Sequence, residues 1–241
     1  MLAEPITPLA ETLYRIALEK LTSYEPSALI VRVRENWTNW LDFYGGKGFT
    51  EFERLWESQL QLAAFVPGSF TATLARVADS GITICTLSDL PDTTVTQRRL
   101  YEAVIELLGD VPFSEPLNIW PFELWQKRFW RNPARRPESF FLAFDGGNIV
   151  GVSELRATSR SAWLSTGLTG VKRKHRRQGV ALALKVRAAQ YAQAAGFEII
   201  KTQNHTTNRA MLAINDRLGF VREPAWIRLK KTLTNPELRQ V

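Results

Sequence analysis

The most constraining feature of the sequence is a basic loop that lies between a strand-like segment and a helix-like segment. The run from Lys172 to Arg177 carries five formal positive charges in six residues, and Gly179 separates it from the helically periodic stretch 180–195. The first N–H groups of a helix have no partner inside it, the helix dipole favours negative charge there, and a glycine allows a phosphate to approach the backbone. The segment therefore predicts an anion-binding site at the start of a helix.

The net charge of +7 suits an acidic partner, and much of that excess lies in this loop. An isolated charge run is often only a solvated face, but its place directly before Gly179 favours a binding site. No interleaved aromatic residues accompany the run, so nucleic acid is not the expected partner. The loop also lacks the second glycine and the Lys-Ser/Thr pair of the common nucleotide-binding loops, which disfavours ATP and NAD.

Composition places the chain among ordinary globular proteins. Its 241 residues are 45% hydrophobic and 23% charged, enough for one large domain or two modest ones. Cys85 is the only cysteine and His175 and His205 are the only histidines, which excludes an intramolecular disulfide and disfavours a structural metal site. The sequence shows neither a signal peptide nor a long apolar run, so we expect a cytoplasmic protein without a membrane partner.

Hydrophobic periodicity predicts an alternation of helices and strands. Helices are expected at 9–21, from Trp37 to about Gly45, and at 95–108, 122–130, 180–195 and 208–218, and strands at 28–33, 82–87, 140–144, 149–155, 163–171, 197–202 and 226–229. The run 52–65 fits either a helix or a strand. The segment Asp145-Gly146-Gly147-Asn148 predicts a hairpin, and turn residues between Pro67 and Gly81 place a domain boundary near Ser80.

The order of elements near the N-terminus recurs near the C-terminus. A helix, a strand and a helix lead to Gly48-Phe49, and the same series leads to Gly219-Phe220, 171 residues later. This pattern indicates a long-period internal duplication. The first copy lacks both the basic loop and the strands that precede it, so residues 1–80 are expected to form a partial unit and residues 81–241 a complete domain.

Two motifs in this order resemble those of a known family. Arg176-Arg177-Gln178-Gly179-Val180-Ala181 resembles the R/Q-x-x-G-x-G/A acyl-CoA loop of the GNAT (Gcn5-related) N-acetyltransferases, and Asn208–Phe220 resembles their second conserved segment. The resemblance implies an α/β fold with a mixed, mostly antiparallel sheet flanked by helices. It also implies a tandem plan, similar to that of mycothiol synthase, in which the N-terminal GNAT-like unit is incomplete.

The resemblance also implies a binding site for acetyl-CoA as co-substrate. Backbone groups of one strand end would pair with the pantetheine arm, amides of the loop would hold the pyrophosphate, and two asparagines would bond the pantetheine side. These residues are Leu168, Thr169, Gly170 and Val171 on the strand, Arg176, Arg177, Gln178, Gly179, Val180 and Ala181 in the loop, and Asn204 and Asn208.

For catalysis, the resemblance implies direct attack of a primary amine on the thioester, the amine belonging to a small molecule or a peptide. Asn215 stands where the family frequently has a general-acid tyrosine, and an amide there would hydrogen-bond the leaving sulfur or the pantetheine instead. Glu154 is either a partly buried general base or a rim glutamate. The alternative to an enzyme is a non-catalytic acyl-CoA-binding or interaction module, and a homodimer is possible in either case.

Aromatic residues in and just before the predicted helix 122–130 have two interpretations. They either line an acceptor pocket or pack in the core. These residues are Trp120, Phe122, Trp125, Phe129 and Trp130.

Overall fold

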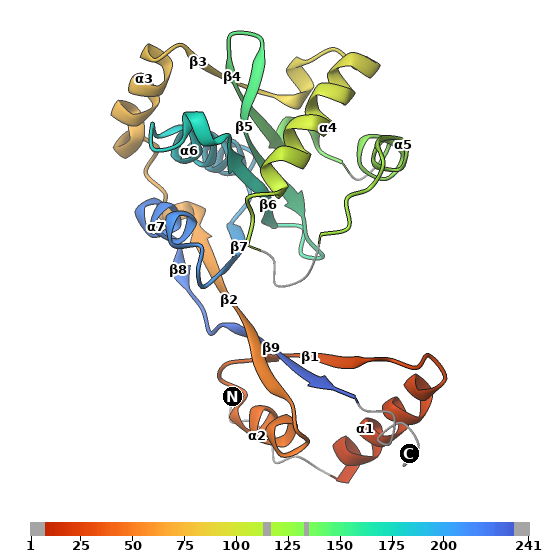
Figure 1. Cartoon of the computed structure of the whole chain (residues 1–241). Helices are drawn as coiled ribbons and strands as arrows, with labels where there is room; N and C mark the ends of the chain where they lie inside the picture. Colours follow the sequence, from red (N-terminus) through yellow and green to blue (C-terminus); the bar gives the residue numbers. More distant parts are fainter. Residues whose placement is uncertain (1–7, 113–116, 133–134, 234–241) are drawn as a thin grey trace. The chain divides into compact units, whose positions relative to one another are not determined.

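In the computed structural model, residues 8–112, 117–132 and 135–233 are described. The chain forms two compact units, one made of Met1–Glu57 with Glu223–Val241 and the other of Ser58–Arg222 (Figure 1). The chain therefore changes unit inside strand β2 (Thr50–Gln61), and not at the boundary expected near Ser80. The reason is packing, since Leu62 and Val77 belong to the core of the larger unit.

Among its described residues, the smaller unit is a three-stranded antiparallel sheet with two helices. It contains α1 (Pro8–Thr22), β1 (Ala28–Arg34), α2 (Thr38–Gly46), the first part of β2, and β9 (Trp226–Thr232). Strand β9 lies between the other two, with Val31 opposite Leu229 and Arg54 opposite Ile227. The closing segment of the chain therefore completes a sheet begun by its first fifty residues.

The larger unit holds the remaining elements. They are α3 (Thr71–Asp79), β3 (Ile82–Thr86), α4 (Thr94–Leu108), α5 (Phe122–Trp125), β4 (Phe140–Asp145), β5 (Asn148–Ala157), β6 (Trp163–Val171), α6 (Val180–Ala194), β7 (Ile199–His205), α7 (Arg209–Leu218) and β8 (Val221–Arg222). Strands β7, β6, β5, β4 and β3 are neighbours in that order, and only the β6–β7 pair is parallel. The predicted mixed, mostly antiparallel sheet flanked by helices is confirmed.

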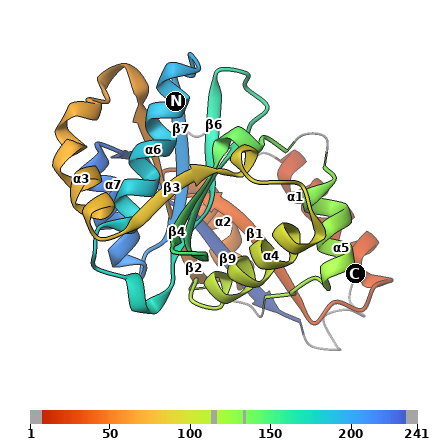
Figure 2. The ribbon, with the colours of Figure 1, turned by 90° about the horizontal axis from the view of Figure 1, so that it is seen from above.

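Helices cover both faces of this sheet. Figure 2 shows α3, α6 and α7 on one side and α4 and α5 on the other. The first side buries Leu164 and Leu184, and the second buries Leu100 and Leu142. Two apolar cores separated by one sheet account for the near-continuous burial along β5.

Several sequence predictions are resolved by this packing. The ambiguous run 52–65 is strand β2 up to Gln61. The segment between Pro67 and Gly81 contains α3, a helix that its turn residues concealed and whose Val77 is buried. The predicted hairpin is present, with Asp145 opposite Asn148. Within the described residues, no helix combines the length and apolar character needed to cross a bilayer.

The aromatic residues between α4 and β4 lie mostly in the core. Phe122, Trp125 and Trp130 are buried, whereas Trp120 is 38% exposed. The core interpretation therefore holds for those three residues, and the partly buried Phe129 packs against the same core. Trp120, before α5, presents its ring to solvent.

Lys185 is a charged residue inside the larger core. It lies on α6, is 4% exposed, and places its Nζ 5.1 Å from the centre of the Phe220 ring. Burial lowers the pKa of Lys185 from 10.5 to about 8, because transfer out of water disfavours the charged ammonium. Between these two pH values the unfolded chain holds a proton that the folded chain has lost, so the free energy of unfolding rises with pH across that window.

We predict that Lys185→Met raises the free energy of unfolding at pH 7 by about 1–3 kcal/mol, since it removes a buried charge while keeping an unbranched side chain. The rise in stability from pH 8 to 10.5 should be smaller than in the parent. Denaturant unfolding at several pH values measures both effects. The exposed Lys127→Met is the matched control, and identical pH dependence in Lys185→Met and the parent would contradict the prediction.

Candidate active site

The candidate site begins where two parallel strands separate. Strands β6 and β7 pair at Trp163, Leu164 and Ser165, opposite Ile199, Ile200 and Lys201. Beyond this point, the pairing of β6 within the described chain is with β5 alone, and a β-bulge interrupts that ladder between Ser153 and Leu155. Bulges bend strands and increase their twist. The far half of β6 therefore turns one edge of its backbone toward open space.

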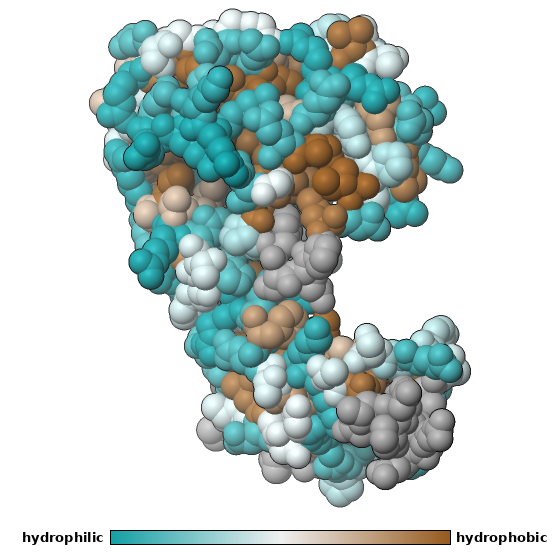
Figure 3. Space-filling view, viewed as in Figure 1, coloured by the Kyte–Doolittle hydropathy of each residue, from teal (hydrophilic) through white to brown (hydrophobic). Residues whose placement is uncertain are grey.

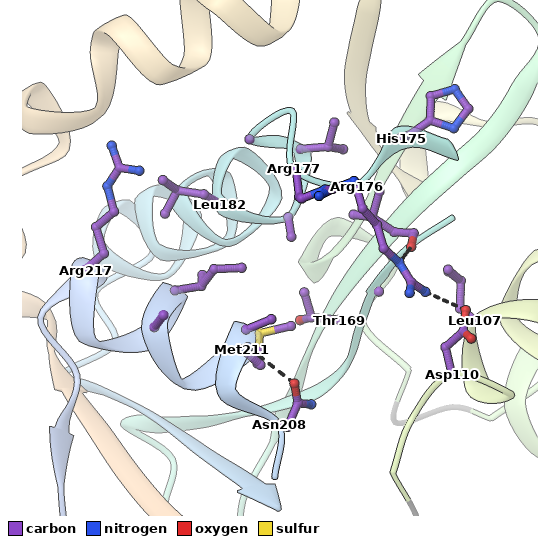
Figure 4. Close-up of a pocket in the computed structure, with 18 of the residues that line it drawn as sticks. Leu107, Asp110, Thr169, His175, Arg176, Arg177, Leu182, Asn208, Met211 and Arg217 are labelled. Atoms are coloured by element: carbon purple, nitrogen blue, oxygen red, sulfur yellow. Dashed lines mark hydrogen bonds and ion pairs between the residues drawn. The ribbon is translucent and has the colours of Figure 1, made fainter. Parts of the chain in front are cut away.

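A cavity of about 530 Å³ lies in this space. Its walls are the end of α4, the end of β6, the start of α6 and one face of α7 (Figure 4). On α7 the lining residues Ala210, Ile214 and Arg217 follow helical spacing, so a single face of that helix is presented to the cavity.

The start of α6 leaves its backbone open to a ligand. Gly179 is its N-cap with a φ of +89°, and no side chain caps the helix. A Cβ at Gly179 would lie 3.2 Å from Arg76 Nη2 and 3.5 Å from Val77 Cγ2. Arg177, two residues earlier, also has a positive φ of +62°. The positive φ therefore favours glycine here, and the first N–H groups of α6 remain open to an anion.

Asp110, just beyond the end of α4, holds two of the loop arginines. Its carboxylate accepts hydrogen bonds from Arg173 Nε at 3.0 Å and from Arg176 Nη2, and these bonds, led by that of Arg173, hold the pKa of Asp110 below its ordinary value. Arg176 Nε also donates to the carbonyl oxygen of Val171 at 2.9 Å. The Arg176 side chain is therefore fixed by protein groups, and the loop is anchored to both α4 and β6.

Most of the residues expected to bind the cofactor meet at this cavity. The cavity is lined by Thr169, Gly170, Val171, Arg176, Arg177, Gly179, Val180, Ala181 and Asn208, and it is not lined by Leu168, Gln178 or Asn204. The lining residues that sequence reasoning missed include Arg76, Leu107, Asp110 and Met211. The helical spacing of α7 pointed to its lining face, but no local signal linked Arg76 or Asp110 to a loop more than sixty residues away.

The two asparagines of α7 differ in position. Asn208 lines the cavity and caps the helix, since its Oδ1 accepts from Met211 N at 3.3 Å. Asn215 is 1% exposed, does not line the cavity, and donates from Nδ2 to Asn204 Oδ1 at 2.7 Å. Asn215 shares a buried helix face with Leu218, and its hydrogen bond to Asn204 connects α7 to β7. This position does not support the contact with the leaving sulfur or pantetheine that the sequence analysis expected.

Glu154 lies on β5 at the bulge, opposite Phe140 of β4. Its side chain is 10% exposed and forms an ion pair with Arg156 Nη2 at 2.7 Å. A Cβ at Gly167 would lie 2.3 Å from Glu154 Oε2, so the carboxylate rests directly against the backbone of β6. Glu154 is thus a nearly buried carboxylate that rests against Gly167, and Gly167 lies two residues along β6 from the cavity residue Thr169. Glu154 does not itself line the cavity.

The fold is shared with several solved structures. The structure is similar to that of a GCN5-related N-acetyltransferase from Sphaerobacter thermophilus, with a TM-score of 0.71 and 21% identity over 93% of this chain and 68% of that one. It is also similar to a tandem GNAT protein from the clavulanic acid biosynthesis pathway (TM-score 0.68, 18% identity, 92% and 69% covered). A third similar structure is a GCN5-related N-acetyltransferase from Kribbella flavida (TM-score 0.64, 17% identity, 96% and 79% covered).

Residues 101–220, just under half of the chain, match the model of the acetyltransferase (GNAT) family. Members of that family are generally enzymes that use acetyl-CoA. A comparison with curated proteins gives no match.

We predict that Asn215→Ala lowers the free energy of unfolding by about 1–2 kcal/mol, the scale of one lost buried hydrogen bond. Acetyl-CoA affinity should change less than about twofold. Chemical denaturation and calorimetric titration measure the two quantities.

Asn204→Ala is the matched variant, and the double variant should lose little more stability than either single one, because both remove the same bond. A large loss of acetyl-CoA affinity at unchanged stability in Asn215→Ala would instead place this residue in the binding site.

Proposed function

We propose that the protein is an acetyl-CoA-dependent N-acyltransferase that moves an acetyl group from the thioester to a primary amine. The observation that carries this proposal is the cavity that runs from the unpaired edge of β6 to the uncapped start of α6. An exposed strand edge offers alternating N–H and C=O groups to an extended amide chain, and a helix start offers N–H groups to a phosphate.

The residues present fit such a co-substrate. Leu107, Met211 and Ile214 give the cavity an apolar wall, whereas Arg177 and Gly179 form a cationic wall with close backbone access. The volume of about 530 Å³ is typical of small-molecule sites. In this proposal the backbone of Thr169 to Val171, together with Asn208, holds the pantetheine arm, and the amides from Gly179 to Ala181 hold the pyrophosphate.

The proposed reaction needs no covalent enzyme intermediate. The neutral amine nitrogen attacks the thioester carbonyl carbon, the proton of the resulting cationic nitrogen passes to a base, and the carbon–sulfur bond breaks to release the thiolate. Backbone N–H groups near Gly170 would stabilise the developing oxyanion. Glu154, held against Gly167 and oriented by Arg156, is the proposed base, acting directly or through water.

The proposed acceptor is an amine with an apolar portion, either a small molecule or a peptide. Leu117, Ile119 and Trp120, in the segment that leads to α5, are all exposed. Figure 3 shows apolar surface over the end of α4 and the chain that follows it. This is the α4 side of the sheet, on which Glu154 also lies.

One observation favours a second candidate function, a non-catalytic acyl-CoA-binding module. Asn215 replaces the frequent family tyrosine and is buried away from the cavity, so it supplies no acid there. In the catalytic proposal, the leaving thiolate takes its proton from water or from the amine.

We further propose that the elements α1 to β2, within the segment 1–80 expected as a partial unit, derive from a second, incomplete GNAT-like unit. The order α1-β1-α2-β2 repeats the order α6-β7-α7-β8. The first copy has no basic loop, so we propose that one acetyl-CoA binds per chain, and that the first copy is a packing partner or a homodimer surface.

We predict that Gly179→Glu abolishes acetyl-CoA binding, because its side chain would meet Arg76 and its carboxylate would repel a phosphate. Calorimetric titration should give one equivalent per chain for the parent and no measurable binding for the variant. Gly196, also at positive φ but with nothing near its Cβ, provides the control Gly196→Glu. Parent-like affinity in Gly179→Glu, or two equivalents bound by the parent, would contradict the proposal.

For catalysis, we predict that Glu154→Gln lowers turnover by about 100-fold or more and removes the acidic limb of the pH–rate profile. Thiol release with a panel of primary amines and amine-bearing peptides measures this. Acetyl-CoA affinity should be retained, since Glu154 does not line the cavity. The exposed Glu102→Gln on α4 is the control, and an unchanged profile in Glu154→Gln would remove this carboxylate from the reaction.

A further inference from the structure

The positive charge of the cavity wall comes from α3 and α7 as well as from the basic loop. Arg173 and Arg176 share the carboxylate of Asp110, so both are already neutralised in part. Three other guanidinium groups line the cavity, those of Arg76, Arg177 and Arg217. Within the described part of the chain, none of these three forms an ion pair.

Arg76 comes from α3, which lies outside residues 101–220 that match the family model. Thr73 and Val77, on the same face of α3 as Arg76, are buried, and each lies within 4 Å of a Cβ built at Gly179. This packing, in the α3–α6 pair visible in Figure 1, brings the Arg76 guanidinium to the start of α6, with Nη2 3.2 Å from the same Cβ position.

Arg217 reaches the cavity from α7. It lies in the last turn of α7, two turns from the lining residue Ala210 at the other end of the same helix face. Figure 4 shows Arg217 beyond Leu182, on the side of the cavity away from Asp110 and Leu107. Its cation is therefore separate from the pair formed by Arg176 and Asp110.

The amides at the start of α6 and the adjacent Arg177 would be enough to bind a ligand whose only negative charge is a pyrophosphate. Two further unpaired guanidinium groups indicate a ligand with more negative charge than that. Guanidinium groups form strong, charge-assisted hydrogen bonds with phosphate oxygens. CoA carries, besides its pyrophosphate, a separate phosphate on the 3′-oxygen of the ribose.

We infer that Arg76 and Arg217 bind the ribose 3′-phosphate of the co-substrate and so make the cavity selective for CoA over 3′-dephospho-CoA. This inference rests on the proposed function and extends it to residues of α3 and α7. It assigns to α3, which sequence analysis left among turns, the role of carrying a specificity-determining side chain.

The test is calorimetric titration of CoA and of 3′-dephospho-CoA into the parent and into Arg76→Gln and Arg217→Gln. The parent should bind CoA at least about tenfold more tightly, and each variant should lose about tenfold in CoA affinity with little change for dephospho-CoA. Arg187→Gln, at an exposed position of α6 outside the cavity, should match the parent for both ligands. Raised salt should weaken CoA more than dephospho-CoA in the parent.

Equal losses for both ligands in Arg76→Gln and Arg217→Gln, or no loss for either, would overturn the inference. A selective loss in one variant alone would remove the other arginine from the assignment. Because both arginines are exposed, folding should be retained, and melting temperatures together with the charge-conserving Arg76→Lys and Arg217→Lys check this. A parent that binds neither ligand would instead contradict the proposed function itself.

Discussion

The separation of β6 from β7 is the constraint on which the rest of the site depends. Two parallel strands that remained paired along their full length would satisfy each other's backbone groups and leave no room for a ligand. Pairing ends after Ser165 and Lys201, and a bulge in the β5–β6 ladder accompanies the divergence. Backbone N–H and C=O groups that lose a strand partner must bond to water or to a ligand. The splayed strand is therefore both the opening of the cavity and its recognition surface.

Packing around α6 makes this opening possible. The helix is buried over most of its surface, and its first turn meets Val77 of α3 while its middle packs against Leu164 and Val150. A helix held this firmly keeps its N-terminal amides in place without an anion to order them. Lys185 is the exception within this apolar surround, and its lowered pKa reflects the energetic penalty of keeping an ammonium group there.

The arginines of the basic loop differ in whether an acidic residue pairs with them. Asp110 partly neutralises Arg173 and Arg176, and these two ion pairs anchor the loop to the end of α4. The remaining field at the cavity comes from Arg76, Arg177 and Arg217, which approach from three different elements. A formal count of charges along the sequence therefore overstates what the loop offers to a ligand and overlooks what α3 and α7 add.

The sequence by itself determined most elements of the larger unit, although not α3, together with the hairpin at Gly146-Gly147 and the glycine at the start of α6, because periodicity, turn residues and helix capping act over a few neighbouring residues. The paired roles of Arg176 and Asp110, the place of Arg76, the burial of Asn215 and the division of the chain inside β2 were decided only by the tertiary structure. Each of these depends on which face of a strand or helix meets a distant segment. A single bulge can change which face of a strand meets a distant segment, and the local pattern of residues does not reveal it.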